Sequence, residues 1–277
     1  MPPSDDLPPG AAPVGAVVMP FDGSPSRDAR AVPEEVAVSV TYATVPFAVM
    51  MATPTDLEDF AYGFSLTEGA IGAAADIRAV AVEPEARGLR LVVNLAPARL
   101  HAHLSRRRSV VGRTGCGLCG IEDLGDLPDA PRAAGPAPPL SLGAVRRALT
   151  ALETRQPLGE ATRGVHAAAF ADGSGRLLLV REDVGRHNAL DKLVGAMLRG
   201  GIAPGDGFAL VTSRCSFEMV EKAAALGIRA LVAISAPTSL ALDRARHHDM
   251  LLLAIARRDA VTVFHGADRV LTDPVPA

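Results

Sequence analysis

Two apolar segments that flank a helical pattern constrain the fold most strongly, and all three lie between Phe208 and Ile234. Residues 208–212 and 229–234 are largely apolar runs of strand length, and residues 216–226 repeat apolar side chains at helical spacing before Gly227. A strand, a helix and a second strand in this order form a right-handed unit whose strands are parallel. The sequence therefore predicts an α/β fold.

The segments around this unit extend it to a mixed sheet flanked by helices on both faces. Before it, the patterns predict a helix at 142–152, paired strands at 165–170 and 176–180, and a helix with apolar side chains from Leu190 to Leu198 that ends at Gly200. After it, they predict a helix at 239–246, a strand at 250–256, a turn at 257–259 and a strand at 261–264. Residues 141–277 are thus expected to form a C-terminal α/β domain.

An α+β arrangement is predicted for the first part of the chain. The patterns predict a hairpin over 36–51, a helix that starts at a capping box of Thr55 and Glu58 and ends at Gly69, strands at 77–82 and 89–95, and a short basic helix or turn at 99–108. Residues 1–30 mix Pro, Gly, Ser and Asp without periodicity, which predicts a disordered tail. Residues 31–126 would form the N-terminal domain, and the Pro/Ala/Gly-rich residues 127–140 a linker.

Composition narrows the classes of function. The chain has 277 residues, of which 48% are apolar, so it can bury one large or two ordinary cores. A formal net charge of -3 argues against bulk binding of nucleic acid or of a membrane surface, and no apolar run approaches the length of a membrane span. Three cysteines are too few for a disulfide framework, and the first residues lack the basic and apolar regions of a signal peptide. We expect a cytoplasmic protein.

Two of the cysteines, Cys116 and Cys119, form a Cys-x-x-Cys motif in a glycine-rich run that follows three arginines at 106–108. Such a pair serves as half of a zinc site, as a redox dithiol or as a nucleophile that carries a group. The sequence has no second Cys-x-x-Cys to complete a zinc site, and glycines stand where a redox dithiol would open a helix. A carrier needs an exposed thiolate, which nearby arginines favour, so this interpretation fits best. Two cysteines that merely face solvent are the simplest alternative.

Polar side chains gather at three further places, each at the end of a predicted strand or the start of a predicted helix. They are Glu182, Asp183, Arg186, His187 and Asn188, then Ser213, Arg214, Cys215 and Ser216, and finally the turn Arg257, Arg258 and Asp259. Anions and nucleotides bind at such places in open α/β sheets, and His187 is also a candidate for proton transfer. The alternatives are ordinary surface residues, helix capping by Ser216 and a solvated turn. His166 lies in an apolar run and is expected to be packed.

Five segments together resemble one protein family. Residues 114–120, 166–169, 181–192, 213–220 and 235–238 read TGCGLCG, HAAA, REDVGRHNALDK, SRCSFEMV and SAPT. In order and spacing they resemble the formate dehydrogenase accessory sulfurtransferase family, FdhD. The resemblance runs from about Glu35 to Arg269 and is more specific than any one of its motifs.

The resemblance implies a sulfur carrier that accepts persulfide sulfur from a cysteine desulfurase. The acceptor would be bis-molybdopterin guanine dinucleotide, the molybdenum cofactor that formate dehydrogenase requires. It also implies a cytidine-deaminase-like core, a homodimer and no tightly held metal. Position by position, Cys116 matches the cysteine that holds the persulfide and Cys119 the second thiol.

The family's cofactor-binding stretch matches Ile255, Ala256, Arg257, Arg258, Asp259 and Ala260. The helix starts would add Arg186, His187, Asn188, Ser213 and Arg214 as partners of the cofactor's phosphates. Cys215 is given no role in sulfur transfer. Two alternatives remain: a non-catalytic chaperone that only holds the cofactor, and a zinc-dependent deaminase, whose His-x-Glu and Pro-Cys-x-x-Cys motifs the sequence lacks.

Overall fold

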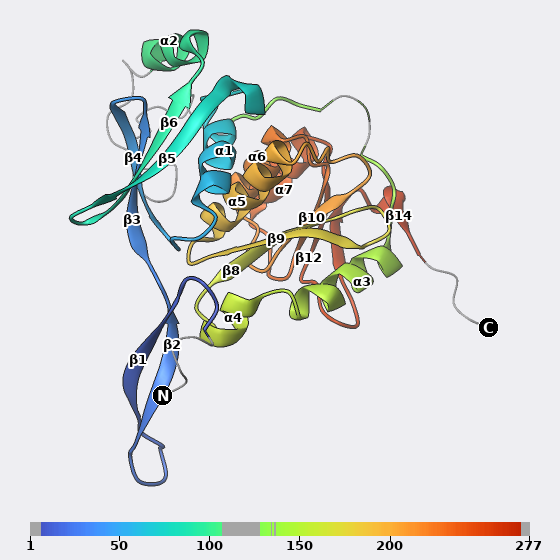
Figure 1. Cartoon of the computed structure of the whole chain (residues 1–277). Helices are drawn as coiled ribbons and strands as arrows, with labels where there is room; N and C mark the ends of the chain where they lie inside the picture. Colours follow the sequence, from blue (N-terminus) through green and yellow to red (C-terminus); the bar gives the residue numbers. More distant parts are fainter. Residues whose placement is uncertain (1–6, 107–127, 134, 136, 273–277) are drawn as a thin grey trace.

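The computed structural model describes residues 7–106, 128–133, 135 and 137–272 of the chain. Figure 1 shows a larger body around a central sheet, a smaller sheet beside it, and a hairpin that projects away from both. No helix among the described residues is long and apolar enough to cross a membrane.

The larger body is organised around a six-stranded sheet of order β13-β12-β11-β10-β8-β9. The strands are β8 (His166–Ala171), β9 (Leu177–Asp183), β10 (Phe208–Val211), β11 (Ala230–Ala233), β12 (Leu251–Ala254) and β13 (Thr262–His265). The β10–β11 and β11–β12 pairs are parallel, whereas β8–β9, β10–β8 and β12–β13 are antiparallel. The predicted mixed sheet is confirmed, and so is the parallel strand–helix–strand unit.

Helices cover both faces of this sheet, as predicted. One face carries α5 (Arg186–Arg199), α6 (Phe217–Ala225) and α7 (Ser239–His247), and the other carries α3 (Leu142–Glu153), which leads into the short α4 (Pro157–Thr162). Successive side chains of β10 point to opposite faces. Ala209 and Val211 belong to the apolar cluster that contains Leu190 of α5, while Phe208 and Leu210 belong to the apolar cluster beneath α3.

A second sheet of four strands, in the order β4-β3-β6-β5, forms the N-terminal part. Its elements are β3 (Val36–Tyr42), β4 (Val45–Ala52), α1 (Leu57–Thr67), η2 (Ala74–Asp76), β5 (Ile77–Glu85), β6 (Gly88–Leu95) and α2 (Pro97–Arg106), so the predicted elements are confirmed. The predicted capping box is wrong. Asp56 occupies the N-cap with a left-handed backbone (φ 51°) and no capping hydrogen bond, so Thr55 lies outside the cap position.

Helices α1 and α5 join the two parts through a close crossing of their backbones. A Cβ added at Gly63 would lie 1.7 Å from Asp191 O, and one added at Gly195 would lie 1.8 Å from Asp59 O. Both positions therefore require glycine. One buried apolar cluster contains residues of the four-stranded sheet, α1, α5 and α6. The domain boundary at 127–140 stays a prediction; the described residues between Pro128 and Pro139 contain no helix or strand.

The expected disordered tail is wrong for the part of it that the structure describes. β1 (Ala11–Val18) and β2 (Ser26–Pro33) pair antiparallel over their whole length as the projecting hairpin of Figure 1. More than half of the residues in its two strands are exposed and none is buried, so backbone pairing rather than a buried apolar face defines it. Such a hairpin has no hydrophobic period for sequence reasoning to detect. The remaining elements are β7 (Leu140–Ser141), η5 (Ala267–Arg269) and β14 (Val270–Leu271), which pairs with β7.

Candidate functional site

The segments that follow β9, β10, β11 and β12 meet at one edge of the six-stranded sheet. The parallel strands β10 to β12 end there, and the antiparallel pairing of β8 brings its first residue to the same place. Thr212 N–H donates to Ala167 O at 3.0 Å, and Ile255 N–H donates to Ser235 O at 3.2 Å. We call this edge the carboxyl edge. It gathers the predicted residues 186–188, 213–214 and 255–260, which are far apart in the sequence.

Asp183, at the end of β9, fixes the turn into α5. Its Oδ1 accepts hydrogen bonds from Gly185 N–H (2.8 Å) and Asn188 Nδ2 (3.0 Å), and its Oδ2 accepts one from Thr53 N–H (3.1 Å). The Lys192 ammonium lies 2.7 Å from Asp183 Oδ2, and both side chains are fully buried. Asn188 is thus engaged by the protein itself and positions the start of α5 rather than facing outward.

Lys192 is a residue whose role the sequence did not reveal. Its ammonium also donates to Thr53 O at 3.0 Å, which ties α5 to the end of β4. Within the segment REDVGRHNALDK, Asp191 and Lys192 are adjacent but serve different pairs, because Asp191 accepts from Lys222 of α6 at 2.9 Å. The helical spacing of Asn188 and Lys192, four residues apart on one face, was the only available signal.

Three buried polar atoms at the starts of α5 and α6 lack hydrogen-bond partners among the described residues. They are Arg186 Nε, His187 Nε2 and Ser216 Oγ. Ser216 is the N-cap of α6, but its hydroxyl makes no capping hydrogen bond, so simple capping does not explain it. Buried polar atoms normally have partners, and unpaired ones mark a place for a ligand or an ordered water. The starts of α5 and α6 are the strongest such place at the carboxyl edge.

The environment of His187 keeps its imidazole neutral near pH 7. Burial, followed by the charge of Arg186, lowers the pKa of His187 from 6.5 to about 4. Burial and Arg186 also lower the pKa of His166, at the start of β8. His187 Nε2 is 3.9 Å from Glu218 Oε2, beyond hydrogen-bond distance. A guanidinium beside neutral imidazoles provides one fixed positive charge with neutral donors or acceptors, which suits an anionic ligand.

The other predicted residues of the 213–216 connection differ sharply in exposure. Ser213 is 4% exposed, and its hydroxyl donates to Arg214 O at 2.9 Å, whereas the Arg214 side chain is exposed. Cys215 is fully buried, and burial raises the pKa of its thiol to about 12. A thiol that stays protonated is a poor nucleophile. Cys215 is therefore a packing residue, in line with its exclusion from sulfur transfer.

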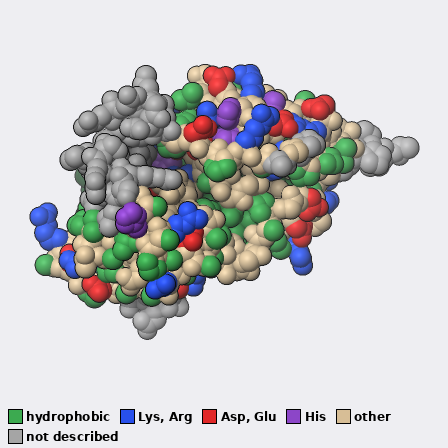
Figure 2. Space-filling view, turned by 90° about the horizontal axis from the view of Figure 1, so that it is seen from above, with side chains coloured by type: hydrophobic (Ala, Val, Ile, Leu, Met, Phe, Trp, Pro, Cys, Tyr) green, Lys and Arg blue, Asp and Glu red, His purple; other side chains and the backbone are tan. Residues whose placement is uncertain are grey.

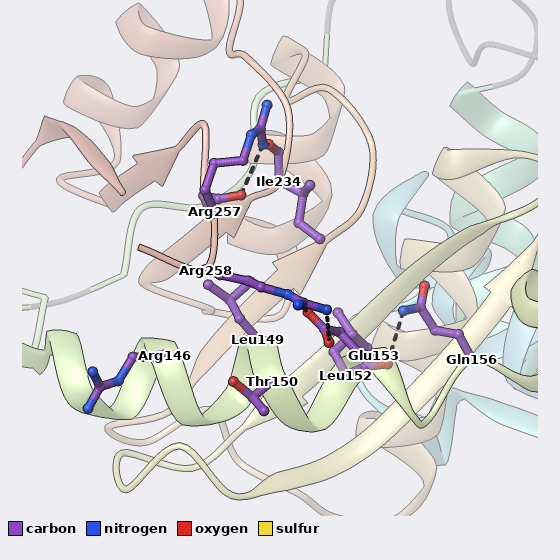
Figure 3. Close-up of a pocket in the computed structure, with 10 residues that line it drawn as sticks. Arg146, Leu149, Thr150, Leu152, Glu153, Gln156, Ile234, Arg257 and Arg258 are labelled. Carbon is purple, nitrogen blue, oxygen red and sulfur yellow. Dashed lines mark hydrogen bonds and ion pairs between the residues drawn. The ribbon is translucent and has the colours of Figure 1, made fainter. Parts of the chain in front are cut away.

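The segment 255–260 borders a cavity of about 200 Å³ on the α3 side of the carboxyl edge. Figure 3 shows that Arg258 reaches across to Glu153 of α3, whereas the Arg257 side chain points away from α3 beside Ile234. Arg258 contacts Glu153 with a bidentate pair at 3.0 and 2.8 Å, whereas Arg257 donates to main-chain carbonyls. The residues that line it are Arg146, Leu149, Thr150, Leu152, Glu153, Gln156, Ile234, Ala256, Arg257 and Arg258.

The backbone of this segment is strained at its first residue. Ile255 has a φ of 53°, a left-handed conformation that is rare for a β-branched side chain, and it is 39% exposed. Arg257 N–H donates to Ala260 O at 2.8 Å, which closes a turn around Asp259. Strained backbone persists where the surrounding structure enforces it, and it is frequent at ligand sites. Cys116 and Cys119, the predicted sulfur-carrying residues, lie outside the described residues.

Comparison with protein families matches residues 33–271 to the FdhD/NarQ family. The chain therefore belongs to the FdhD/NarQ family. The FdhD/NarQ match includes the whole carboxyl edge and both motif cysteines, while β1 and nearly all of β2 precede it. This family match does not support the alternative that the chain is a zinc-dependent deaminase.

The descriptions of individual similar proteins agree with this family assignment. A sulfur carrier protein FdhD of Bordetella parapertussis is 46% identical over 239 residues, which cover 86% of this chain and 87% of that protein. A second, from Xanthomonas euvesicatoria, is 47% identical over 236 residues and covers 85% of this chain and 84% of its own length. Among solved structures, a protein from Desulfotalea psychrophila assigned as a formate dehydrogenase accessory protein superposes with a TM-score of 0.75 at 26% identity. That match covers 95% of this chain and all of the other.

Proposed function

We propose that this chain is a cytoplasmic sulfurtransferase that carries sulfur as a persulfide on Cys116 and serves the maturation of formate dehydrogenase. Three observations support the proposal: membership of the FdhD/NarQ family, the similarity over 86% of the chain to a protein described as a sulfur carrier, and the Cys-x-x-Cys motif in a glycine-rich run beside arginines. The sulfur donor would be a cysteine desulfurase, and the enzyme whose cofactor receives the sulfur would be formate dehydrogenase.

The chemistry at Cys116 is thiol–persulfide exchange. The Cys116 thiolate attacks the outer sulfur of the donor's persulfide, the donor's sulfur–sulfur bond breaks, and the donor cysteine leaves as a thiolate. Cys116 then holds the outer sulfur until an acceptor that donates an electron pair attacks it, the sulfur–sulfur bond breaks and Cys116 leaves as the thiolate. Thiolate fraction and access decide the rate of such a step, so Cys215, which is buried, is excluded from it.

The observation that best supports the acceptor is the set of unpaired buried atoms at the carboxyl edge. Arg186 Nε, His187 Nε2 and Ser216 Oγ would meet phosphate oxygens of bis-molybdopterin guanine dinucleotide. The cavity beside Arg257 and Arg258 offers a second basic pocket at the same edge. When bound, the cofactor would supply the molybdenum that receives the sulfur. The chain's residues would bind its anionic groups and hold them beside the thiol.

Three finer features complete the proposal. The order of β8 to β12, an antiparallel pair followed by parallel strands connected through helices, supports a cytidine-deaminase-like core. A homodimer would place a carboxyl edge on each subunit for a cofactor with two guanine nucleotides. Ile255 to Ala260, Ser213 and Arg214 would contribute contacts around those two pockets, while Asn188 would position the start of α5.

Incubation with a cysteine desulfurase and cysteine, followed by peptide mass spectrometry with and without reductant, tests the carrier role. We expect a reductant-labile sulfur on the peptide that contains Cys116, and its loss in Cys116→Ala. The matched control is Cys215→Ala, which keeps both motif cysteines and is expected to load normally. Cys116→Ala protein that restored formate dehydrogenase activity as well as the wild type would instead support a chaperone that only holds the cofactor.

A further inference from the structure

The chain that follows the Cys-x-x-Cys motif is attached to α6 and α7 through a charged cluster. Ala130 N–H donates to Glu221 Oε2 at 2.7 Å, and the Arg244 guanidinium contacts both Glu221 Oε1 and Asp129 Oδ1. Glu221 is 3% exposed, whereas the Asp129 side chain is 65% exposed. We call Asp129, Ala130, Glu221 and Arg244 the clasp. Asp129 follows Cys119 by ten residues in the sequence.

Two histidines complete the surroundings of the clasp. His248 Nε2 lies 3.0 Å from Glu221 Oε1, and His247 Nε2 lies 3.6 Å from Asp129 Oδ1. Figure 2 shows basic, acidic and histidine side chains side by side on this face of the larger body. One ligand atom each of Asp129, His247 and His248 lies within 4.8 Å of the others, as a metal site would require. The Arg244 guanidinium already lies against both carboxylates, so the cation of this cluster is the arginine.

The clasp lies close to the carboxyl edge because α6 connects them. Ser216, whose buried hydroxyl lacks a partner, caps α6, and Glu221 is five residues further along the same helix. A rise of 1.5 Å per residue places the two about 7.5 Å apart along the helix axis. The clasp thus attaches the chain after the cysteine motif to the helix that begins at the candidate ligand site.

We propose that the clasp is a positioning device: it fixes Asp129 and Ala130 on the helix that begins at the carboxyl edge, and so limits how far Cys116, thirteen residues before Asp129, can lie from that edge when sulfur is delivered. The inference rests on the proposed function of Cys116. A reactive group that is held near its acceptor reacts as if it were at high local concentration, and small misplacements are costly. Loss of the clasp therefore impairs delivery of sulfur from Cys116 more than it impairs loading from a soluble donor.

The clasp itself is tested by hydrogen exchange at the amide of Ala130, which reports its bond to Glu221 directly. In Arg244→Gln we expect this amide to exchange about tenfold faster, the change that corresponds to a loss of about 1.4 kcal/mol of charged hydrogen bonding. Trypsin cleavage after Arg132, an exposed residue, should accelerate in parallel. The matched control is Arg246→Ala, which removes an exposed pair with Asp243 on the same helix and should change neither rate.

Positioning is tested by separate measurement of loading and delivery. In Arg244→Gln we expect persulfide on Cys116 within about twofold of wild type, but a rate of sulfur delivery to the cofactor about tenfold lower. Arg244→Lys, which keeps the charge but lacks the planar fork, should give an intermediate rate. Asp129→Asn tests the exposed half of the clasp without disturbing a buried group, and it should follow Arg244→Gln with a smaller effect.

Each contrary outcome overturns a different statement. Unchanged Ala130 exchange in both Arg244→Gln and Asp129→Asn would show that there is no clasp. Faster exchange with unchanged delivery would refute the positioning role. Wild-type protein that takes up no persulfide on Cys116 would refute the proposed function and the positioning role with it, while the exchange result would still decide the clasp. If wild type held one equivalent of zinc and His248→Ala did not, zinc rather than Arg244 would be the cation of the cluster.

Discussion

Replacement of Lys192 by methionine is expected to destabilise the protein strongly. The Lys192 ammonium is fully buried, 2.7 Å from Asp183 Oδ2, and it also donates to Thr53 O at 3.0 Å. Lys192→Met keeps most of the side-chain volume but leaves the Asp183 carboxylate buried without its counter-charge. Removal of one partner of a buried ion pair costs about 3–5 kcal/mol. We expect the free energy of unfolding to fall by an amount in this range.

Urea unfolding of a double-mutant cycle isolates the charge effect. Asp183→Asn combined with Lys192→Met removes both charges, so the double variant should be more stable than the sum of the single losses predicts, with a coupling energy of about 2 kcal/mol. Arg176→Met, which breaks an exposed pair with Asp172, is the control and should cost less than about 1 kcal/mol. A loss below about 1 kcal/mol in Lys192→Met, or strictly additive effects, would refute the reasoning.

The other predictions concern packing, protonation and thiol reactivity. Gly63→Ala and Gly195→Ala each place a Cβ within 1.8 Å of a carbonyl oxygen of the opposite helix, so α1 and α5 must separate, and thermal unfolding should show a loss above about 3 kcal/mol. The pKa of His187, near 4 when folded and 6.5 when unfolded, means that stability is complete above pH 6.5 and falls by about 3 kcal/mol as the pH drops to 4. Urea unfolding across this range should show the slope in wild type and a clearly shallower one in His187→Gln, in which His166 still contributes. Burial of Cys215 predicts no alkylation by iodoacetamide in native protein and full alkylation in urea, read by mass spectrometry; labelling in the native state would contradict the buried placement.

Elements that are encoded by local patterns could be predicted from the sequence. The β10–α6–β11 unit follows from two apolar runs and one helical repeat that ends at Gly227, and the structure reproduces it with parallel strands. The β1–β2 hairpin could not be predicted, because its stability comes from backbone pairing with mostly exposed side chains. The capping box at Thr55 failed because the next residue, Asp56, adopts a left-handed conformation that no local pattern announces.

The sequence indicated which residue types could form the candidate site, but not how their side chains are arranged. Arg186 and His187 stood out as a dense polar group before a helix, yet only the fold shows that their buried atoms and the Ser216 hydroxyl lack partners. Conversely, Asn188 looked like a ligand contact, but its amide donates to Asp183 and to Met51 O. The pairing of Asp183 with Lys192 combines residues nine apart that neither strand nor helix periodicity connects.

The buried polar groups inside α5 and α6 differ from those at the starts of the same helices. In the interior, buried charges are paired: Asp183 with Lys192, and Asp191 with Lys222. These pairs stabilise little relative to apolar residues, but they favour the observed arrangement of α5 and α6, because an arrangement that separated the partners would leave a buried charge unpaired. At the carboxyl edge the same two helices begin with atoms that have no partner among the described residues. A rigid pair of helices that presents unpaired donors at its starts is preorganised for an anionic ligand, because the cost of ordering those donors is met during folding rather than on binding.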